Sequence, residues 1–197
     1  MSAEDRFELE ARHQLRAASD LARVMGETMA ESVSELATLV LATLRGGGKL
    51  LLCGNGGSAA DAQHIAAEYV VRFRRTRAPM AAIALTTDTS VLTAGANDLG
   101  FAAVFERQVR ALGRPGDLLI LHSTSGESEN VIRAARAARD LDMATAALLA
   151  KGGGRLRAEV DLALVVPTDE TSRAQEAHLV VQHVVCDLVE GMLEDGR

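Results

Sequence analysis

The sequence predicts an α/β protein in which helices cover both faces of a central, mostly parallel β-sheet. Short continuous apolar runs, typical of strands buried on both faces, alternate with longer stretches of helical periodicity. The three prolines, Pro79, Pro115 and Pro167, fall before or after these runs and never inside one. We therefore expect a doubly wound sheet of about five strands.

Residues 1–46 are predicted to form a helical segment outside the sheet. Apolar residues such as Leu21, Val24 and Leu36 recur at helical spacing from about Ala3 to Leu44, and no proline interrupts them. The glycines at 46–48 end this stretch. One long helix and two consecutive helices both fit the pattern.

Residues 47–197 are predicted to form the α/β core. The apolar runs predict strands at 49–53, 81–85, 117–121, 144–149 and 160–166. The periodic stretches between and after them predict helices at 59–72, 101–111, 130–139 and 171–194. Since no linker or internal repeat divides the chain, we expect one domain over residues 1–197.

The composition excludes several classes of partner. The formal net charge is −6 and aromatic residues make up 3%, whereas a nucleic-acid binder needs a basic face and aromatic platforms. Two cysteines make no disulfide framework, which is typical of a reducing compartment. Neither a signal-peptide pattern nor an apolar run of about 20 residues is present. We expect a cytoplasmic protein without nucleic-acid or membrane partners.

Two loops at the expected carboxyl edge of the sheet are suited to an anion. Gly54-Asn55-Gly56-Gly57-Ser58 allows close backbone approach at a helix start, and Ser123-Thr124-Ser125-Gly126-Glu127-Ser128 offers four hydroxyls at another. Each loop alone also fits an ordinary helix cap. Gly54-x-Gly56-x-x-Ala59 satisfies the loose dinucleotide-binding pattern, but the next strand does not end on an acidic residue. Both loops together favour a phosphate site.

Four motifs carry a resemblance to a known family. They are the segment from Gly54 to His64, Ala96-Asn97-Asp98, Ser123-Thr124-Ser125-Gly126-x-Ser128, and Gln175-Glu176-x-His178. In this order and spacing the chain resembles the phosphoheptose isomerases of the sugar isomerase (SIS) fold. The resemblance implies conversion of sedoheptulose 7-phosphate to D-glycero-D-manno-heptose 7-phosphate through an enediol, the first step of nucleotide-activated heptose synthesis. It also implies a homotetramer.

The acid–base and metal groups are assigned by the same resemblance. His64 and Glu68 share one helix face, and this spacing alone fits an ordinary hydrogen bond. The resemblance implies one Zn²⁺ per subunit held by His64, Glu68, Gln175 and His183, with Glu68 as the base at C1 and His183 as the acid or proton shuttle. Gln175 and His183 lie about 12 Å apart along an ideal helix. Either Gln175 lies in an irregular helix start or subunits share the site, and we favour sharing.

The substrate-binding residues follow from the resemblance in the same way. The phosphate would be held by Ser58, Ser123, Thr124, Ser125 and Ser128. The sugar would be held by Asn55, Gly56, Gly57, Asn97, Asp98 and Gln175. Arg72 is the one member of the basic cluster 72–77 that we place near substrate; complementing the negative helix end is an equally weighted role for this cluster.

Other polar residues have structural interpretations. Glu127, where the family often has Asn, is expected to face away from the phosphate and to cap its helix. The remaining histidines and the cysteines are interpreted as structural residues, the cysteines as buried ones: His13, His122, His178, Cys53 and Cys186.

Two further functions are compatible with the sequence. SIS-fold regulators, including the replication-initiator-associating type, bind phosphosugars or proteins without catalysis. Glu68 and His183 favour the enzyme, because the binding module lacks both groups in our interpretation. A different enzyme, acting on a pentose or hexose phosphate, is the third possibility, since these loops do not determine the number of carbons.

Overall fold

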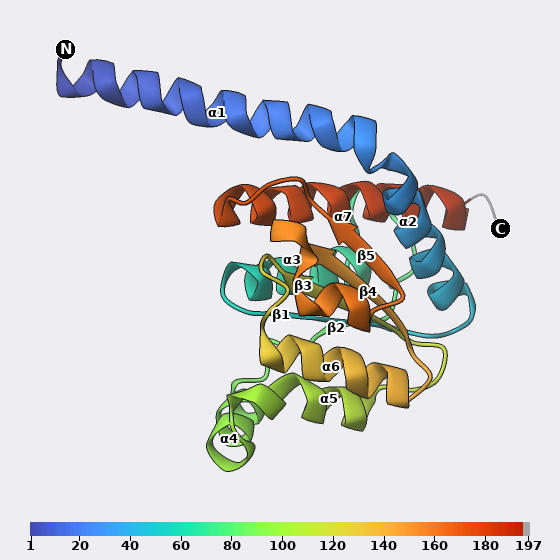
Figure 1. The fold of residues 1–197 in the computed structure, drawn as a ribbon. Coiled ribbons are helices and arrows are strands. Elements are labelled where there is room, and N and C mark those ends of the chain that lie inside the picture. The colour runs from blue at the N-terminus through green and yellow to red at the C-terminus, as the bar shows by residue number, and fades with distance from the viewer. Residues whose placement is uncertain (195–197) are drawn as a thin grey trace.

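The computed structural model describes residues 1–194, which form a five-stranded sheet between layers of helices (Figure 1). The strands are β1 (Leu50–Gly54), β2 (Ala82–Ala84), β3 (Leu118–Ser123), β4 (Ala144–Leu149) and β5 (Leu162–Val165). Their order is β2-β1-β3-β4-β5 and all neighbours are parallel. The predicted doubly wound class is confirmed.

Seven helices surround the sheet within the described residues. They are α1 (Ala3–Thr28), α2 (Ala30–Arg45), α3 (Gly57–Val70), α4 (Thr89–Leu99), α5 (Val104–Leu112), α6 (Glu129–Asp140) and α7 (Thr171–Glu194). Short 3-10 turns lie at Phe101–Ala103, Lys151–Gly153 and Arg155–Glu159. Helices α2, α3 and α7 cover one face, while α5 and α6 cover the other with α4 beside them (Figure 1).

The N-terminal segment consists of two helices that meet at Met29. Met29 is both the C-cap of α1 and the N-cap of α2. Helix α1 extends away from the sheet (Figure 1). A capping box between Ser2 and Asp5 starts α1, but Met25 is its one buried residue. In contrast, α2 buries an apolar face that includes Leu36 and Val40.

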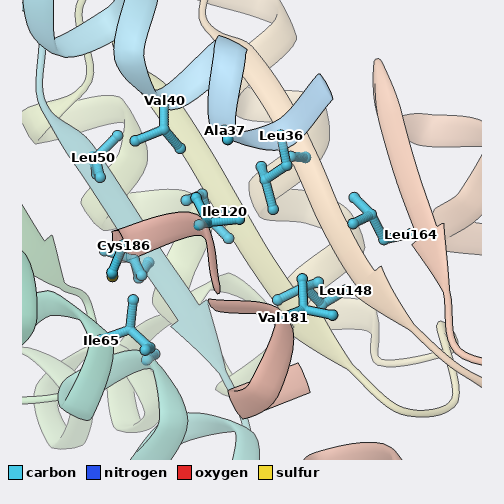
Figure 2. Close-up of a cluster of buried hydrophobic side chains, with 14 of the residues drawn as sticks. Leu36, Ala37, Val40, Leu50, Ile65, Ile120, Leu148, Leu164, Val181 and Cys186 are labelled. Carbon is cyan, nitrogen blue, oxygen red and sulfur yellow. The ribbon is translucent and has the colours of Figure 1, made fainter. Parts of the chain in front are cut away.

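Two hydrophobic clusters, one on each face of the sheet, form the core. Leu50 and Ile120 point toward α2, α3 and α7 (Figure 2), whereas Leu51 and Leu119 point toward α5 and α6. Because successive strand residues face opposite sides, a strand covered on both faces must be apolar throughout. The continuous apolar runs in the sequence reflect this burial, which also includes both cysteines.

Some element boundaries differ from the predicted ones. Helix α4 lies outside the predicted helices because none of its residues is buried, so no apolar period marks it. Helix α3 begins at Gly57, inside the first loop, and ends at Val70, so Arg72 follows the helix. The fifth strand is shorter than expected and covers Leu162–Val165. Within residues 1–194, no helix combines the length and apolarity needed to span a bilayer.

The topology brings the two predicted anion loops together. The chain moves from β1 outward to β2 and then returns to β3 on the other side of β1, so the strand order reverses between β1 and β3. Gly54 at the end of β1 pairs in register with His122 near the end of β3. The loops that follow these strands therefore start side by side, at the position where open α/β sheets bind ligands.

Candidate active site

A pocket of about 270 Å³ lies at the carboxyl ends of β1 and β3. It is lined by Asn55, Gly56, Gly57, Ser58, His122, Ser123, Thr124, Ser125, Ser128, Thr171 and Gln175. The eight loop residues predicted to bind substrate, together with Gln175, are among them. His122, interpreted from the sequence as structural, and Thr171, the first residue of α7, also line the pocket. The sequence signal that could have indicated Thr171 is a hydroxyl residue at the start of the helix that follows the fifth strand.

The first loop presents backbone N–H groups to this pocket. Gly56 precedes α3 with φ 57° and ψ −123°, a conformation that favours glycine. Within the described chain no side chain caps α3, and the Ala59 and Ala60 N–H groups donate to the Gly56 carbonyl. The amides of Gly57 and Ser58 are the ones available to an anion. Gly57 also permits close packing of α7, since an added Cβ would lie 2.5 Å from Nε2 of Gln175. The Gln175 amide is therefore held at the edge of the pocket.

The serine loop is shaped by its own hydroxyls. Ser123 Oγ accepts a hydrogen bond from the Gly126 N–H at 3.1 Å, and Ser125 Oγ accepts one from the Glu127 N–H at 3.2 Å. Gly126 has φ +66°, and a Cβ there would collide with the carbonyl of Gly153. The loop thus curls around a point at the start of α6, where hydroxyls and amides converge.

Glu127 faces away from the pocket, as predicted, but it does not cap its helix. Its carboxylate accepts hydrogen bonds from the Arg155 backbone N–H at 2.9 Å and from Arg155 Nε at 2.7 Å. These bonds lower the pKa of Glu127 below its ordinary value. The extra negative charge is therefore paired outside the proposed phosphate site.

The Asn55 side chain forms two hydrogen bonds with the side chain of Asn130. Its Nδ2 donates to Oδ1 of Asn130 at 2.9 Å, and Asn130 Nδ2 donates back to Asn55 Oδ1 at 2.8 Å. Asn130 belongs to α6, so this amide pair joins the first loop to the helix that follows the second. The pairing makes Asn55 a support of the pocket wall, which the sequence pattern does not reveal.

A cluster of His64, Glu68 and His183 lies between α3 and α7. The ligand atoms of the three side chains are all within 4.8 Å of one another. His64 Nε2 is 2.9 Å from His183 Nε2 and 3.5 Å from Glu68 Oε1. The predicted convergence of these three residues is thus present, and each offers an atom that can bind a metal ion.

The His183 imidazole has a defined environment. The Phe73 ring stacks on it, with centroids 5.2 Å apart and planes inclined by 19°. Burial, followed by the neighbouring His64, lowers the pKa of His183, and Glu68 opposes this shift. Phe73 is absent from the predicted site, because its contact with His183 links segments far apart in the sequence.

Gln175 lies toward the pocket end of α7. The helix is regular from Thr171 onward, so the irregular helix start considered for Gln175 is wrong. His183 is eight residues further along, about 12 Å by helical rise. The pocket and the three-residue cluster therefore occupy successive positions along the paired helices α3 and α7.

Three other predicted site residues lie outside this region of the single chain. Asn97 and Asp98 are exposed on α4, where Asn97 Nδ2 donates to Asp98 Oδ1 at 2.7 Å. Arg72 is exposed just beyond the end of α3. Helix α4 stands on the opposite side of the sheet from α3 and α7 (Figure 1), so one chain does not bring Asn97 and Asp98 to the pocket.

Comparison with known proteins agrees with this geometry. A family model described as the SIS domain matches residues 13–150. A phosphoheptose isomerase of Roseiflexus sp. (strain RS-1) is 57% identical over 180 residues, which cover 91% of each chain. The structure of phosphoheptose isomerase GmhA from Neisseria gonorrhoeae matches with TM-score 0.89 and 43% identity, covering 94% of this chain and 99% of that one. The enzyme from Francisella tularensis matches with TM-score 0.90 and 34% identity, covering 96% and 98%.

Proposed function

This chain belongs to the SIS-domain family, among the phosphoheptose isomerases, and from this premise we propose that it converts sedoheptulose 7-phosphate to D-glycero-D-manno-heptose 7-phosphate. It is an isomerase, and the reaction proposed is the first step of nucleotide-activated heptose synthesis. The observation that carries the proposal is the His64, Glu68 and His183 cluster, which lies two helical turns from a pocket lined by hydroxyls and amides.

The pocket is suited to the phosphate group. Two helix N-termini, those of α3 and α6, direct unpaired backbone N–H groups and positive partial charge toward it. The hydroxyls that we assign to the phosphate are those of Ser58, Ser123, Thr124, Ser125 and Ser128. No net positive charge is needed for this mode of binding, which agrees with a chain of net charge −6.

The distance between pocket and cluster suits a long, open sugar chain. Gly57 and His64 are separated by about 10 Å of helical rise along α3. In an extended sugar phosphate, the phosphate lies at one end and the reacting carbonyl near the other. We assign the hydroxyls between them to Gln175 and to the backbone of Asn55, Gly56 and Gly57, which line the wall of the pocket.

Glu68 and His183 are the proposed acid–base pair. The Glu68 carboxylate takes the proton from C1 of the ketose, which gives an enediol, and then returns the proton to C2. His183 supplies a proton to the oxygen on C2 and removes one from the oxygen on C1. Burial lowers the pKa of His183, which favours the neutral ring as the group that accepts a proton.

The donor set also fits Zn²⁺. Two imidazole nitrogens and one carboxylate within 4.8 Å are ligand types that zinc prefers. Because Gln175 lies about 12 Å along α7 from His183 of the same chain, we propose that the fourth ligand is Gln175 of a neighbouring subunit. When bound there, Zn²⁺ would polarise the sugar carbonyl as a Lewis acid. Metal binding competes with proton transfer, because a carboxylate or imidazole that binds a metal is a weaker base.

We further propose a homotetramer with shared active sites. Helix α4 buries none of its residues within one chain, yet it carries Asn97 and Asp98. In this assembly, contacts between chains bring Asn97, Asp98 and Arg72 near the pocket of a neighbouring chain. Exposed apolar residues on α1 and α7, which include Phe7, Leu15 and Val184, provide the surface for such contacts.

The Glu68→Gln variant tests the acid–base assignment. The amide keeps the size of the side chain but cannot take a proton, so we expect kcat to fall by at least about 10²-fold. NMR of the sugar products measures turnover, and circular dichroism checks that the fold is unchanged. Glu31→Gln on the exposed side of α2 is the matched control and should keep full activity. Near-normal turnover by Glu68→Gln would exclude Glu68 as the base.

A further inference from the structure

Glu190 on α7 is a buried carboxylate with four donors. Its side chain is 0% exposed. Oε1 accepts from the Phe73 N–H at 2.8 Å and from Arg77 Nε at 2.9 Å, and Oε2 accepts from the Arg74 and Arg75 N–H groups at 2.9 and 3.0 Å. Burial raises the pKa of Glu190, but these contacts outweigh burial and lower it overall. The carboxylate is therefore ionised and holds three consecutive amides of the loop after α3.

Arg77 connects this carboxylate to the end of α3. Its guanidinium Nη2 donates to the Glu68 carbonyl at 2.7 Å, and Nη1 donates to the Tyr69 carbonyl at 2.8 Å. The cation thus satisfies carbonyls that α3 leaves unpaired at its C-terminus. Arg77 therefore has the role considered for the basic cluster 72–77, which is to complement the negative end of a helix. One buried ion pair joins the helix that carries His64 and Glu68 to the helix that carries His183.

The same loop places an aromatic ring on His183. Phe73, whose N–H is bound by Glu190, stacks on the imidazole with centroids 5.2 Å apart. Glu190 follows His183 by seven residues, two turns along the same face of α7. The Arg74 guanidinium lies 5.2 Å from the Phe73 centroid. Phe73 is therefore fixed through its backbone by Glu190 and contacted by His183 and by Arg74.

We propose that Glu190 and Arg77 are positioning residues, which hold Phe73 against His183 and so fix the direction of the His183 imidazole toward His64 and Glu68. An imidazole can rotate about its last side-chain bond, and a ring stacked on one face restricts that rotation. The consequence for turnover rests on the function proposed above. The geometric consequence, a fixed His183 ring, does not depend on it.

The geometric part is tested by NMR of the histidine ring protons. The chain has five histidines, so the signals are few, and the spectrum of a His183→Gln variant identifies those of His183. A stacked aromatic ring shields protons above its face. We expect the His183 signals to move downfield in Phe73→Leu, to stay in place in Phe73→Tyr, and to move in Glu190→Gln as well.

The catalytic part is tested by separating kcat from KM. Misplacing His183 leaves the phosphate pocket intact, so we expect Phe73→Leu to lower kcat about 10-fold or more while KM changes less than about 2-fold. Phe73→Tyr keeps an aromatic ring on His183 and should therefore keep the native kcat. Asp187→Asn is the matched control, because Asp187 pairs with Arg74 and Arg75 of the same loop but does not bind the Phe73 N–H. It should keep kcat within about 2-fold.

The outcomes are distinct. Unshifted His183 signals in a folded Phe73→Leu protein, or an unchanged kcat, would overturn the proposal. If Glu190→Gln does not fold, the test rests on Phe73→Leu. The Phe73 side chain is only half-buried, so we expect this variant to fold. If the native chain does not isomerise sedoheptulose 7-phosphate, the proposed function fails, whereas the ring-proton shifts still test whether Phe73 fixes His183.

Discussion

At the scale of single residues, His122 and His178 are two buried imidazoles below the serine loop. Their ring centroids lie 6.5 Å apart. His178 Nε2 is 3.1 Å from the Leu149 carbonyl, and His122 Nε2 is 3.0 Å from Gln182 Nε2. Burial lowers the pKa of His122 to about 3 and that of His178 to about 4. Both rings are therefore neutral in the folded chain near neutral pH.

These histidines predict a loss of stability in mild acid. In the unfolded chain each would take up a proton below pH 6.5, whereas in the folded chain each stays neutral until about pH 4 or 3. The unfolded state binds more protons in this window, so the free energy of unfolding falls as the pH falls. At pH 5 each histidine should cost ~2 kcal/mol relative to pH 7. Urea unfolding at the two pH values measures the difference.

A paired substitution isolates the contribution of His122. His122→Leu combined with Gln182→Leu removes the titrating ring without leaving a buried amide unpaired. This double variant should remove about 2 kcal/mol from the change between pH 7 and pH 5. His13→Ala, on the exposed surface of α1, should leave the change as it is. An undiminished change in the double variant would show that His122 is protonated in the folded chain.

At the scale of elements, the serine loop depends on the space beside Gly126. Gly126 and Gly152 both have positive φ, +66° and +77°, but only at Gly126 would a Cβ meet backbone, that of Gly153. Alanine costs about 1 kcal/mol of backbone strain at either position. Gly126→Ala should in addition displace the loop and raise KM for the sugar phosphate about 10-fold or more. Gly152→Ala should keep KM, and steady-state kinetics of the two variants provide the test. Equal KM values for the two variants would show that the shape of the serine loop does not affect phosphate binding.

The elements that the sequence predicts well are those with a burial pattern of their own. Strands β1, β3 and β4 are continuous apolar runs because both faces of the sheet are covered. Helix α4 has no buried face and therefore no apolar period to detect. Its Asp88 cap, which accepts from the Val91 N–H at 3.0 Å, is the local signal that remains.

Predictability of the site follows the same division. The two loops are recognisable because glycine and hydroxyl residues at helix starts have a local physical reason to be there. The pairing of Asn55 with Asn130 and the stacking of Phe73 on His183 join segments 75 and 110 residues apart. Contacts of this kind depend on how helices pack, so spacing along the chain does not contain them.

At the scale of the whole molecule, the unpartnered surfaces predict an oligomer. Val180, Val184, Leu188 and Met192 are exposed on α7 at intervals of four residues and form one apolar stripe. Light scattering of the native protein should give the mass of a tetramer. Val184→Arg with Leu188→Arg should lower that mass and reduce kcat, because shared sites come apart. Ala111→Arg on the exposed side of α5 is the control, and a monomeric native protein with full activity would contradict the shared site.

The isomerase activity itself is tested most directly by following sedoheptulose 7-phosphate by NMR in the presence of the native protein. We expect the aldose to appear, conversion to stop after treatment with a chelator, and Zn²⁺ to restore it. Conversion that persists in chelator would show an isomerase that works without a metal ion. Binding of the sugar phosphate without conversion, both before chelation and with Zn²⁺ added, would contradict the isomerase activity and identify a non-catalytic phosphosugar-binding protein.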